Sequence, residues 1–289
     1  MGNIAGALIA TSTTLFAFTV IVAVIRVWSR LYLSRNFAVE DCLMVTSLLL
    51  YAALTAISYS LLQYGLGQHI SNVHSPHSIT QISKLTIALG ATFVAGVGAA
   101  KISILLFYLK TFAIRTISII VMILLVVTTS YTIACCLGLI FPCSPFGRAW
   151  DPTITHGYCI DRFALYYAHG GLNLAVDLAI IGLPLPLIWH LHVPKREKLV
   201  ISALVTVCII AVAVGSTRFW ATHALQNGGD LTWHTALGVI FGEVEVSANI
   251  VCGSIIVMRP FFRRYVPAVI MSEGDYMSQI TSSSMVSFV

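Results

Sequence analysis

The 289-residue chain has few charged side chains, because lysine, arginine, aspartate and glutamate together make up only 9% of it. A soluble globular domain carries roughly 25% charged residues, since it needs them to keep its surface hydrated. Hydrophobic residues instead make up 58% of the chain, and its mean hydropathy is +0.91. The shortage of charge therefore excludes a soluble fold and predicts a protein that crosses a lipid bilayer several times.

Features that mark several other classes of protein are also scarce. The net charge is only +5, and no basic patch alternates with aromatic residues, so we expect no nucleic-acid partner. The seven cysteines lack the short regular spacing of zinc, haem or dense disulfide sites. His74-x-x-His77 and His190-x-His192 have no carboxylate or cysteine at ligand spacing. The sequence therefore predicts neither a bound metal ion nor a cofactor.

Long apolar runs are abundant. A helix needs roughly 20 apolar residues to cross the hydrocarbon core of a bilayer. Seven runs of this kind lie at about 4–27, 42–63, 85–109, 117–140, 163–189, 200–217 and 233–257. We therefore expect an all-α, polytopic bundle of seven transmembrane helices that forms one domain over residues 1–263. A short polar, serine-rich tail follows at 264–289.

The basic residues predict how this bundle is oriented. Eleven of the sixteen lysines and arginines, Arg26 and Arg30 among them, fall in one set of loops, and four fall in the opposite set. Cytoplasmic loops carry the excess of lysine and arginine. We therefore expect the N-terminus outside or in a lumen and the C-terminus in the cytoplasm. The expected location is the plasma membrane or the endoplasmic reticulum, with the lipid bilayer as the first partner.

The predicted outer loop over residues 141–162 contains two cysteines, Cys143 and Cys159. In this orientation both face the oxidising side of the membrane, where disulfides form and persist. A disulfide between them is therefore one possibility. Two free thiols are the other, because a bond also requires suitable distances between the two residues.

Three ionisable residues fall near the middle of predicted membrane spans, namely Lys101, Asp177 and Glu245. Each charge at this depth costs about 3 kcal/mol or more, so each one is a candidate functional residue. His169 and Asn173 precede Asp177 at intervals of four residues, which places the three on one helix face. Asn249 follows Glu245 at the same interval. We expect Lys101 to pair with Asp177 or Glu245 inside the bundle.

A purely structural interpretation of these residues stays open. A buried pair between Lys101 and Asp177 can do no more than fix the register of two helices. Glu243 lies two residues before Glu245, which puts the two carboxylates about 200° apart around a regular helix. They cannot both face one pocket, and contact with a neighbouring helix or a lipid headgroup is the simpler explanation for Glu243.

Several short segments are weak signals alone but specific in their combined order and spacing. They are 64–69 (YGLGQH), 101–109 (KISILLFYL), Cys143-x-Pro145, Trp150, 159–161 (CID), 173–178 (NLAVDL), 183–189 (LPLPLIW), Glu245 and 259–262 (RPFF). Over about residues 10–263 the chain resembles the fungal rhodopsin-domain family of seven-helix membrane proteins. That family includes the transmembrane region of a class of fungal receptors and membrane proteins of secondary-metabolite gene clusters, such as the satratoxin cluster.

The resemblance implies seven helices and a filamentous-fungal source, but it does not imply light sensing. Rhodopsins hold retinal on a lysine of the last helix, whereas the run at 233–257 has no lysine and Lys101 lies on the third. The third span also lacks a Glu/Asp-Arg-Tyr triplet, and the seventh lacks Asn-Pro-x-x-Tyr. G-protein coupling therefore has no motif to support it.

Two functions remain in competition. The first is a receptor-like or accessory protein that binds a small lipophilic metabolite inside the bundle. Its expected ligand-binding residues are Lys101, His169, Asn173, Asp177, Glu245 and Asn249. The second is an intramembrane cyclase or isomerase acting on a polyketide or terpenoid intermediate. Burial in an apolar bundle favours the protonated form of a carboxylic acid, so Asp177 or Glu245 would then be the catalytic acid.

Overall fold

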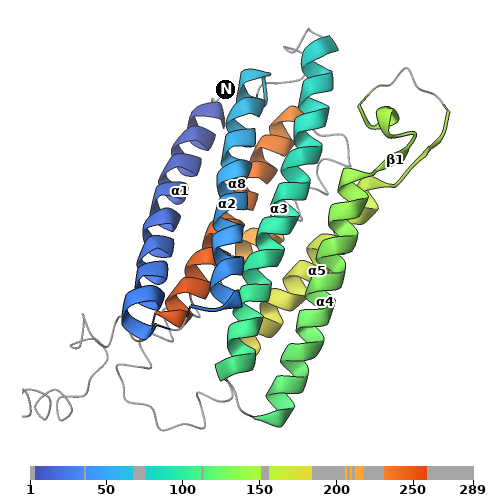
Figure 1. Ribbon diagram of the computed structural model, residues 1–289. Coiled ribbons are helices and arrows are strands. Elements are labelled where there is room, and N and C mark those ends of the chain that lie inside the picture. Colours follow the sequence, from blue (N-terminus) through green and yellow to red (C-terminus); the bar gives the residue numbers. More distant parts are fainter. Residues whose placement is uncertain are drawn as a thin grey trace, which may run out of the picture.

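The computed structural model describes residues 4–35, 37–67, 76–111, 114–150, 156–183, 206, 209, 212–217 and 231–258. Six long helices dominate this part of the chain (Figure 1). They are α1 (Ile4–Trp28), α2 (Val39–Gln63), α3 (Pro76–Thr111), α4 (Arg115–Ile140), α5 (Arg162–Gly182) and α8 (Leu231–Val257). A π-helical turn, η1 (Ser29–Ser34), extends α1.

The predicted helical membrane bundle is confirmed, since all six helices are long and apolar enough to span a bilayer. Helix α8 packs against α1, α2 and α3, and α4 packs against both α3 and α5. The predicted sixth span at 200–217 lies mostly outside the described residues, which include a helical segment at 212–217. The predicted tail at 264–289 lies outside them altogether, as do residues 184–189 of the predicted fifth span.

Aspartates explain where two of the helices begin. Asp161 precedes α5, and its Oδ1 accepts hydrogen bonds from the amides of Phe163 and Ala164 at 2.9 and 3.3 Å. Near the start of α2, Asp41 accepts the amide N–H of Ala38 at 3.3 Å. A carboxylate in this position meets amides that have no partner in the first helical turn.

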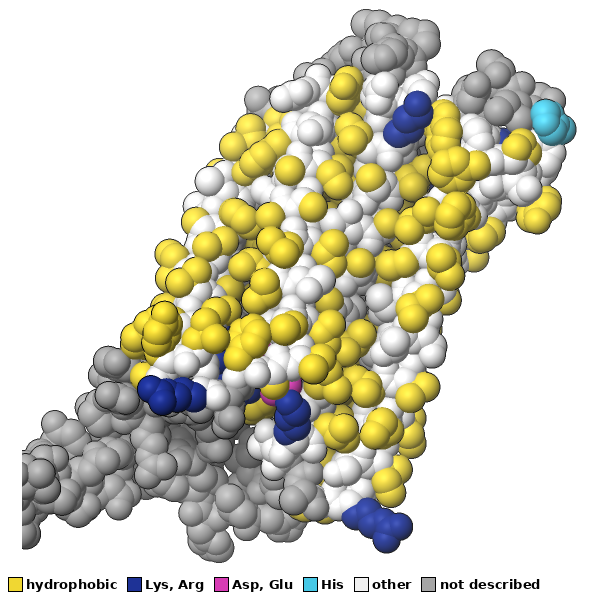
Figure 2. All heavy atoms as spheres, in the orientation of Figure 1, with side chains coloured by type: hydrophobic (Ala, Val, Ile, Leu, Met, Phe, Trp, Pro, Cys, Tyr) yellow, Lys and Arg dark blue, Asp and Glu magenta, His cyan; other side chains and the backbone are white. Residues whose placement is uncertain are grey.

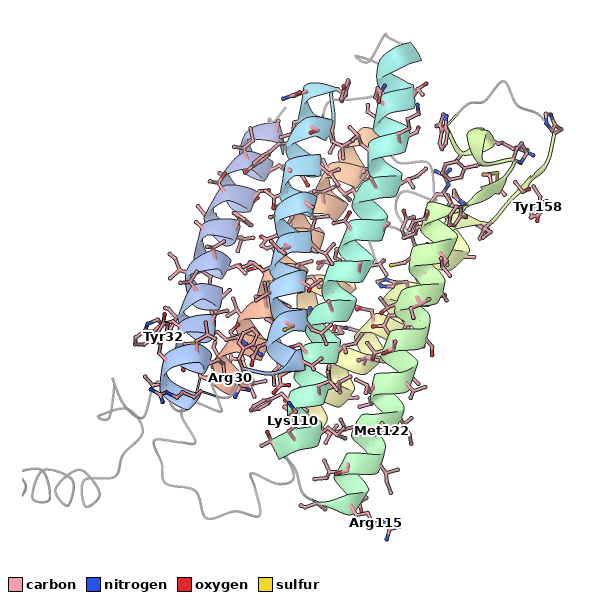
Figure 3. The ribbon with its side chains drawn as sticks, viewed as in Figure 1. Arg30, Tyr32, Lys110, Arg115, Met122 and Tyr158 are labelled. Atoms are coloured by element: carbon pink, nitrogen blue, oxygen red, sulfur yellow. A yellow bond between two sulfur atoms is a disulfide. The ribbon has the colours of Figure 1, made fainter. Side chains whose placement is uncertain are left out.

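The surface of the bundle is suited to lipid. Hydrophobic side chains cover the middle of the face shown in Figure 2, and lysines and arginines lie toward the two ends. Large apolar side chains on α1 and α4, such as Val24 and Val126, are each 58% exposed. Arg30, Lys110 and Arg115 lie toward one end and Tyr158 toward the other (Figure 3). Which of these ends faces the cytoplasm stays a prediction.

Two of the helices form the centre of the bundle. In the membrane-spanning stretches of α3 and α8, 61% and 67% of the residues are buried, compared with 22% in α1 and 28% in α4. The main apolar core includes Val97 and Leu105 of α3 and Ile250 of α8. Gly98 lets α4 approach α3 closely, because a Cβ on Gly98 would lie 2.5 Å from the side chain of Thr132.

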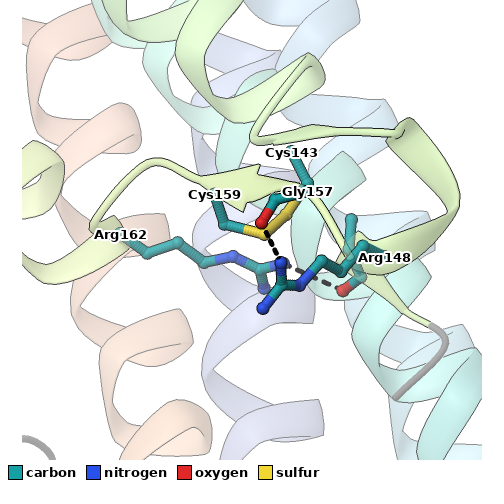
Figure 4. Close-up of a disulfide and its surroundings, with 6 residues drawn as sticks. Cys143, Arg148, Gly157, Cys159 and Arg162 are labelled. Atoms are coloured by element: carbon teal, nitrogen blue, oxygen red, sulfur yellow. Dashed lines mark hydrogen bonds between the residues drawn. A yellow bond between two sulfur atoms is a disulfide. The ribbon is translucent and has the colours of Figure 1, made fainter. Parts of the chain in front are cut away.

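A small disulfide-bonded hairpin connects α4 and α5 (Figure 4). Its strands, β1 (Cys143–Ser144) and β2 (Tyr158–Cys159), are antiparallel, and Cys143 and Cys159 are directly paired and bonded through their sulfurs. Two arginines hold the loop further, since Arg148 donates to the carbonyl of Gly157 and Arg162 donates to that of Ala149 at 2.9 Å. Between the strands lies a short 3-10 helix, η3 (Phe146–Ala149).

Candidate functional site

Lys101 is the centre of a polar network buried between three helices. Its side chain on α3 is fully buried. The ammonium lies 2.9 Å from Oδ1 of Asp177 on α5. It also donates to the carbonyl and to the side-chain oxygen of Asn173, at 2.8 and 2.7 Å. The structure thus selects Asp177 as the partner of Lys101.

Asn173 connects this ion pair to the second carboxylate. Its Nδ2 donates to Oε1 of Glu245 on α8 at 2.6 Å. Asn173 therefore accepts from Lys101 with its oxygen and donates to Glu245 with its nitrogen. One turn further along α8, Nδ2 of Asn249 donates to the main-chain carbonyl of Glu245 at 2.9 Å. The result is a continuous chain of hydrogen bonds across α3, α5 and α8.

His169 lies one helical turn before Asn173 on α5 and is 2% exposed. Its ring makes edge contacts with Phe93 of α3 and Tyr131 of α4, at centroid distances of 6.1 and 5.7 Å. The imidazole thus belongs to an aromatic layer next to the polar network. The six residues predicted for ligand binding therefore lie in one region, and their roles in binding or catalysis stay predictions.

Tyr131 is a residue of this site that the sequence did not reveal. Its side chain is buried and interacts electrostatically with both Asp177 and Glu245. The Tyr131 hydroxyl lies within reach of the Thr132 hydroxyl, but neither of them, nor the buried hydroxyl of Thr128, has a hydrogen bond of good distance and angle among the described residues. The available signal was the spacing Thr128-x-x-Tyr131-Thr132, which places three hydroxyls on one side of α4.

A second charged cluster lies toward the end of the bundle where α1 and α3 finish. Arg26, counted above among the loop residues, is instead buried in α1 and is 1% exposed. It donates to Asp41 at 2.9 Å and to the carbonyl of Gly253 on α8 at 2.7 Å. Glu40 accepts from Lys110 at 2.6 Å. Arg26 lies at the end of an apolar run of the sequence. Its burial depends on its partner Asp41 on α2, and the composition of the run does not reveal that partner.

Within the described ranges, no group of three or more histidine, cysteine, aspartate and glutamate residues could hold a metal ion. Nor does the described seventh span, α8, contain a lysine that could bind retinal. The Lys101 network itself consists of one ion pair and several hydrogen bonds.

Comparison with known proteins relates the whole bundle to one family. The model of the fungal rhodopsin domain matches residues 25–264. The chain is 23% identical over 259 residues to the polyenoic acids biosynthesis gene cluster protein Ba17b of Metarhizium anisopliae, covering 85% of this chain and 71% of that protein. It is 25% identical to the satratoxin biosynthesis SC1 cluster protein 4 of Stachybotrys chartarum, covering 51% of each.

A further relative is named as a receptor. The chain is 23% identical over 176 residues to receptor GIN3 of Arthrobotrys oligospora, covering 60% of this chain and 42% of that protein. The chain thus spans about half the length of two of these three relatives. No solved structure matches the chain.

Proposed function

Because the chain belongs to the fungal rhodopsin domain family, we propose that it is a multi-pass membrane protein of fungal secondary metabolism. It binds a small lipophilic metabolite inside its helical bundle, in a receptor-like or accessory role. Similar proteins are named for biosynthetic gene clusters, and another is named as a receptor. The observation that carries the proposal is the buried Lys101–Asn173–Asp177–Glu245 network, faced by the hydroxyl of Tyr131.

The buried Tyr131 hydroxyl favours the binding of a ligand in this region. A buried polar group without a partner costs about 1–3 kcal/mol. A ligand with one or two oxygen atoms would recover that cost by hydrogen bonding to Tyr131, while its hydrocarbon part contacts the aromatic layer of Phe93 and His169. Apolar sites with a few convergent polar groups are typical of small-molecule binding, and helical bundles build them in their cores.

One observation also favours an intramembrane enzyme as the second candidate. Glu245 is only 1% exposed and is held at 2.6 Å by the amide of Asn173. A carboxylic acid fixed in this way in an apolar core is a suitable proton donor to an alkene or epoxide. In that case Glu245 or Asp177 is the acid, and His169, Tyr166 or Asn173 positions the substrate.

The test is metabolite profiling of a strain lacking the gene, complemented with the wild type, Asp177→Asn or Glu245→Gln. We expect both variants, at normal protein level, to lower all products of the affected pathway together with its transcripts. Small molecules that copurify with the wild-type protein should be lost from both variants. Thr92→Val is the matched control, because Thr92 is a half-buried residue of α3 whose hydroxyl donates to the carbonyl of Ala88 on its own helix.

The outcomes separate the two functions. Accumulation of one defined intermediate in the carboxylate variants would assign a chemical step to the protein and overturn the receptor-like role. An unchanged metabolite profile and unchanged copurifying molecules in both variants would contradict both functions.

A further inference from the structure

A second carboxylate is buried on the other side of α8. Glu243 lies next to the middle of that helix and is 1% exposed. Glu245 is two residues further on, about 200° around the helix, and faces the Lys101 network. Glu243 instead faces α1 and α2. The contact with a neighbouring helix that we expected for Glu243 is present, but both sides of the contact are polar.

The groups that face Glu243 are hydroxyls. The hydroxyls of Ser12 on α1 and Ser58 on α2 lie within hydrogen-bonding reach of its carboxylate, and the phenol of Tyr51 on α2 interacts with it electrostatically. All three side chains are fully buried. Neither carboxylate oxygen of Glu243 has a hydrogen bond of good distance and angle among the described residues, and the same is true of the Ser12 and Tyr51 hydroxyls. The Ser58 hydroxyl donates to the carbonyl of Leu54 at 2.9 Å, so the lone pairs of its oxygen stay available.

No basic side chain in the described part of the chain offsets this carboxylate. The ion pairs found there join Arg26, Arg30, Lys101 and Lys110 to other acids, and none includes Glu243. An isolated carboxylate at the middle of a bilayer is costly. A proton on Glu243 would remove the charge, but the neutral carboxyl would offer the surrounding hydroxyls fewer acceptor sites than the carboxylate does.

We propose that Glu243 binds a hard monovalent cation, with sodium as the probe of choice, together with the hydroxyl oxygens of Ser12, Tyr51 and Ser58. Oxygen-only ligand sets favour hard cations over transition metals. A single carboxylate balances one positive charge, whereas a divalent ion would leave one charge uncompensated inside the bundle. One bound ion would meet all the unpartnered oxygens at once. This alkali-metal ion is an addition to the sequence-based expectation of no metal.

The cation would connect α1, α2 and α8 at mid-depth. It lies on the face of α8 opposite the Lys101 network, so the site does not depend on the proposed metabolite. The proposed site predicts that sodium stabilises the protein. An ion that binds only the folded state raises the free energy of unfolding once the ion concentration exceeds the dissociation constant.

The experiment measures the thermal unfolding midpoint of the full chain, purified in detergent, as sodium chloride replaces N-methyl-D-glucamine chloride at constant ionic strength. We expect the midpoint of the wild type to rise with sodium. Glu243→Gln should remove this dependence, and Ser12→Ala and Tyr51→Phe should shift the half-maximal sodium concentration at least tenfold upward. Glu245→Gln is the control on the same helix and should keep the wild-type sodium response.

Three results would overturn the proposal. The first is a wild-type midpoint that is equal in both salts, which would mean that water or a proton meets these oxygens. The second is a sodium response that persists in Glu243→Gln. If Glu243→Gln does not fold, the proposal is tested with Ser12→Ala and Tyr51→Phe instead. The third result is then a half-maximal sodium concentration that is the same in both of these variants as in the wild type.

Discussion

The side chain of Lys101 is accommodated inside the bundle because its geometry matches that of its surroundings. An ammonium has three N–H donors, and three oxygens surround it, two from Asn173 and one from Asp177, all within 2.9 Å. A buried ion pair offsets its desolvation only when the remaining donors are also satisfied. The arrangement therefore depends on Asn173 as much as on the opposite charge, and an arginine, with its flat guanidinium, would not reproduce it.

Removing one partner of this pair is expected to destabilise the protein strongly. Lys101→Met leaves Asp177 buried without its cation, so the free energy of unfolding should fall by about 3–5 kcal/mol. Replacing both residues, as in Lys101→Met/Asp177→Leu, should recover most of that loss, because neither member of the ion pair is then buried without the other. Thermal and denaturant unfolding of the purified variants in detergent measures both effects as a double-mutant cycle.

Lys110→Met is the control on the same helix. The Lys110 side chain is 55% exposed, and Arg30 also faces its partner Glu40, at 3.5 Å. We therefore expect a clearly smaller loss of stability than for Lys101→Met. Equal losses in the two variants, or a double variant as unstable as Lys101→Met alone, would show that the buried pair is not the source of the effect.

The charged residues of the site are easier to predict from the sequence than its buried hydroxyl groups. Lys101, Asp177 and Glu245 are conspicuous, since charges are rare and costly in apolar runs, and their spacing already placed Asp177 with Asn173. Tyr131 and Ser12 were not predicted, because tyrosine, serine and threonine are ordinary residues in membrane helices. Whether such a hydroxyl is buried depends on how its helix is rotated against its neighbours, and one sequence does not determine that rotation.

Among the elements, α3 approaches α4 through a glycine. A Cβ on Gly98 would lie within 2.5–3.1 Å of three side-chain atoms of Thr132. Thr132 is branched at Cβ, so it has few rotamers with which to move away. Without a hydrophobic driving force inside the bilayer, helices associate through close packing of this kind at small residues.

Gly98→Ala is therefore expected to destabilise the bundle by about 1–3 kcal/mol, the usual cost of overpacking. Gly171→Ala on α5 is the matched control, because a Cβ there has nothing within 4 Å and alanine favours the helix. Unfolding midpoints in detergent compare the two variants. A Gly98→Ala protein as stable as Gly171→Ala would mean that α3 and α4 can separate without loss.

The sequence predicted the helices well where apolar runs end sharply. For α1 and α8 the predicted and observed ends differ by at most two residues. Helix α3 begins at Pro76, well before the predicted residue 85, because Lys84 and other polar residues continue the helix beyond its apolar part. In this polar part of α3, Nζ of Lys84 lies 5.2 Å from the centroid of the Trp150 ring. That contact comes from the hairpin between α4 and α5, so the apolar pattern of α3 does not reveal it.

For the whole molecule, one charged cluster joins four helices at a single end. Arg26 on α1 reaches Asp41 on α2 and the carbonyl of Gly253 on α8, while Lys110 on α3 reaches Glu40. Basic residues at this end of the bundle thus have two roles, since some join helices and others indicate which side of the membrane the end faces. Arg26 is buried and joins helices, so it does not report sidedness in the way that exposed residues such as Arg115 do.

Orientation can be tested at two exposed positions. Gln63 at the end of α2 is expected on the outer or lumenal side, and Arg115 at the start of α4 on the cytoplasmic side. The test places Gln63→Cys or Arg115→Cys in a Cys42→Ser/Cys208→Ser background, since Cys42 is an exposed free thiol and Cys208 lies outside the described residues. A membrane-impermeant maleimide is then added to sealed vesicles of known sidedness.

We expect Gln63→Cys to be labelled only from the outer or lumenal side and Arg115→Cys only from the cytoplasmic side. Permeabilised vesicles, in which both react, serve as the control. The physical reason is the excess of exposed lysine and arginine near Arg115, which disfavours transfer of that end across the membrane. The disulfide between Cys143 and Cys159 fits the same orientation, since it lies at the end of the bundle predicted to face the oxidising side. Labelling with the opposite sidedness would place this disulfide in the reducing cytosol and reject the predicted topology.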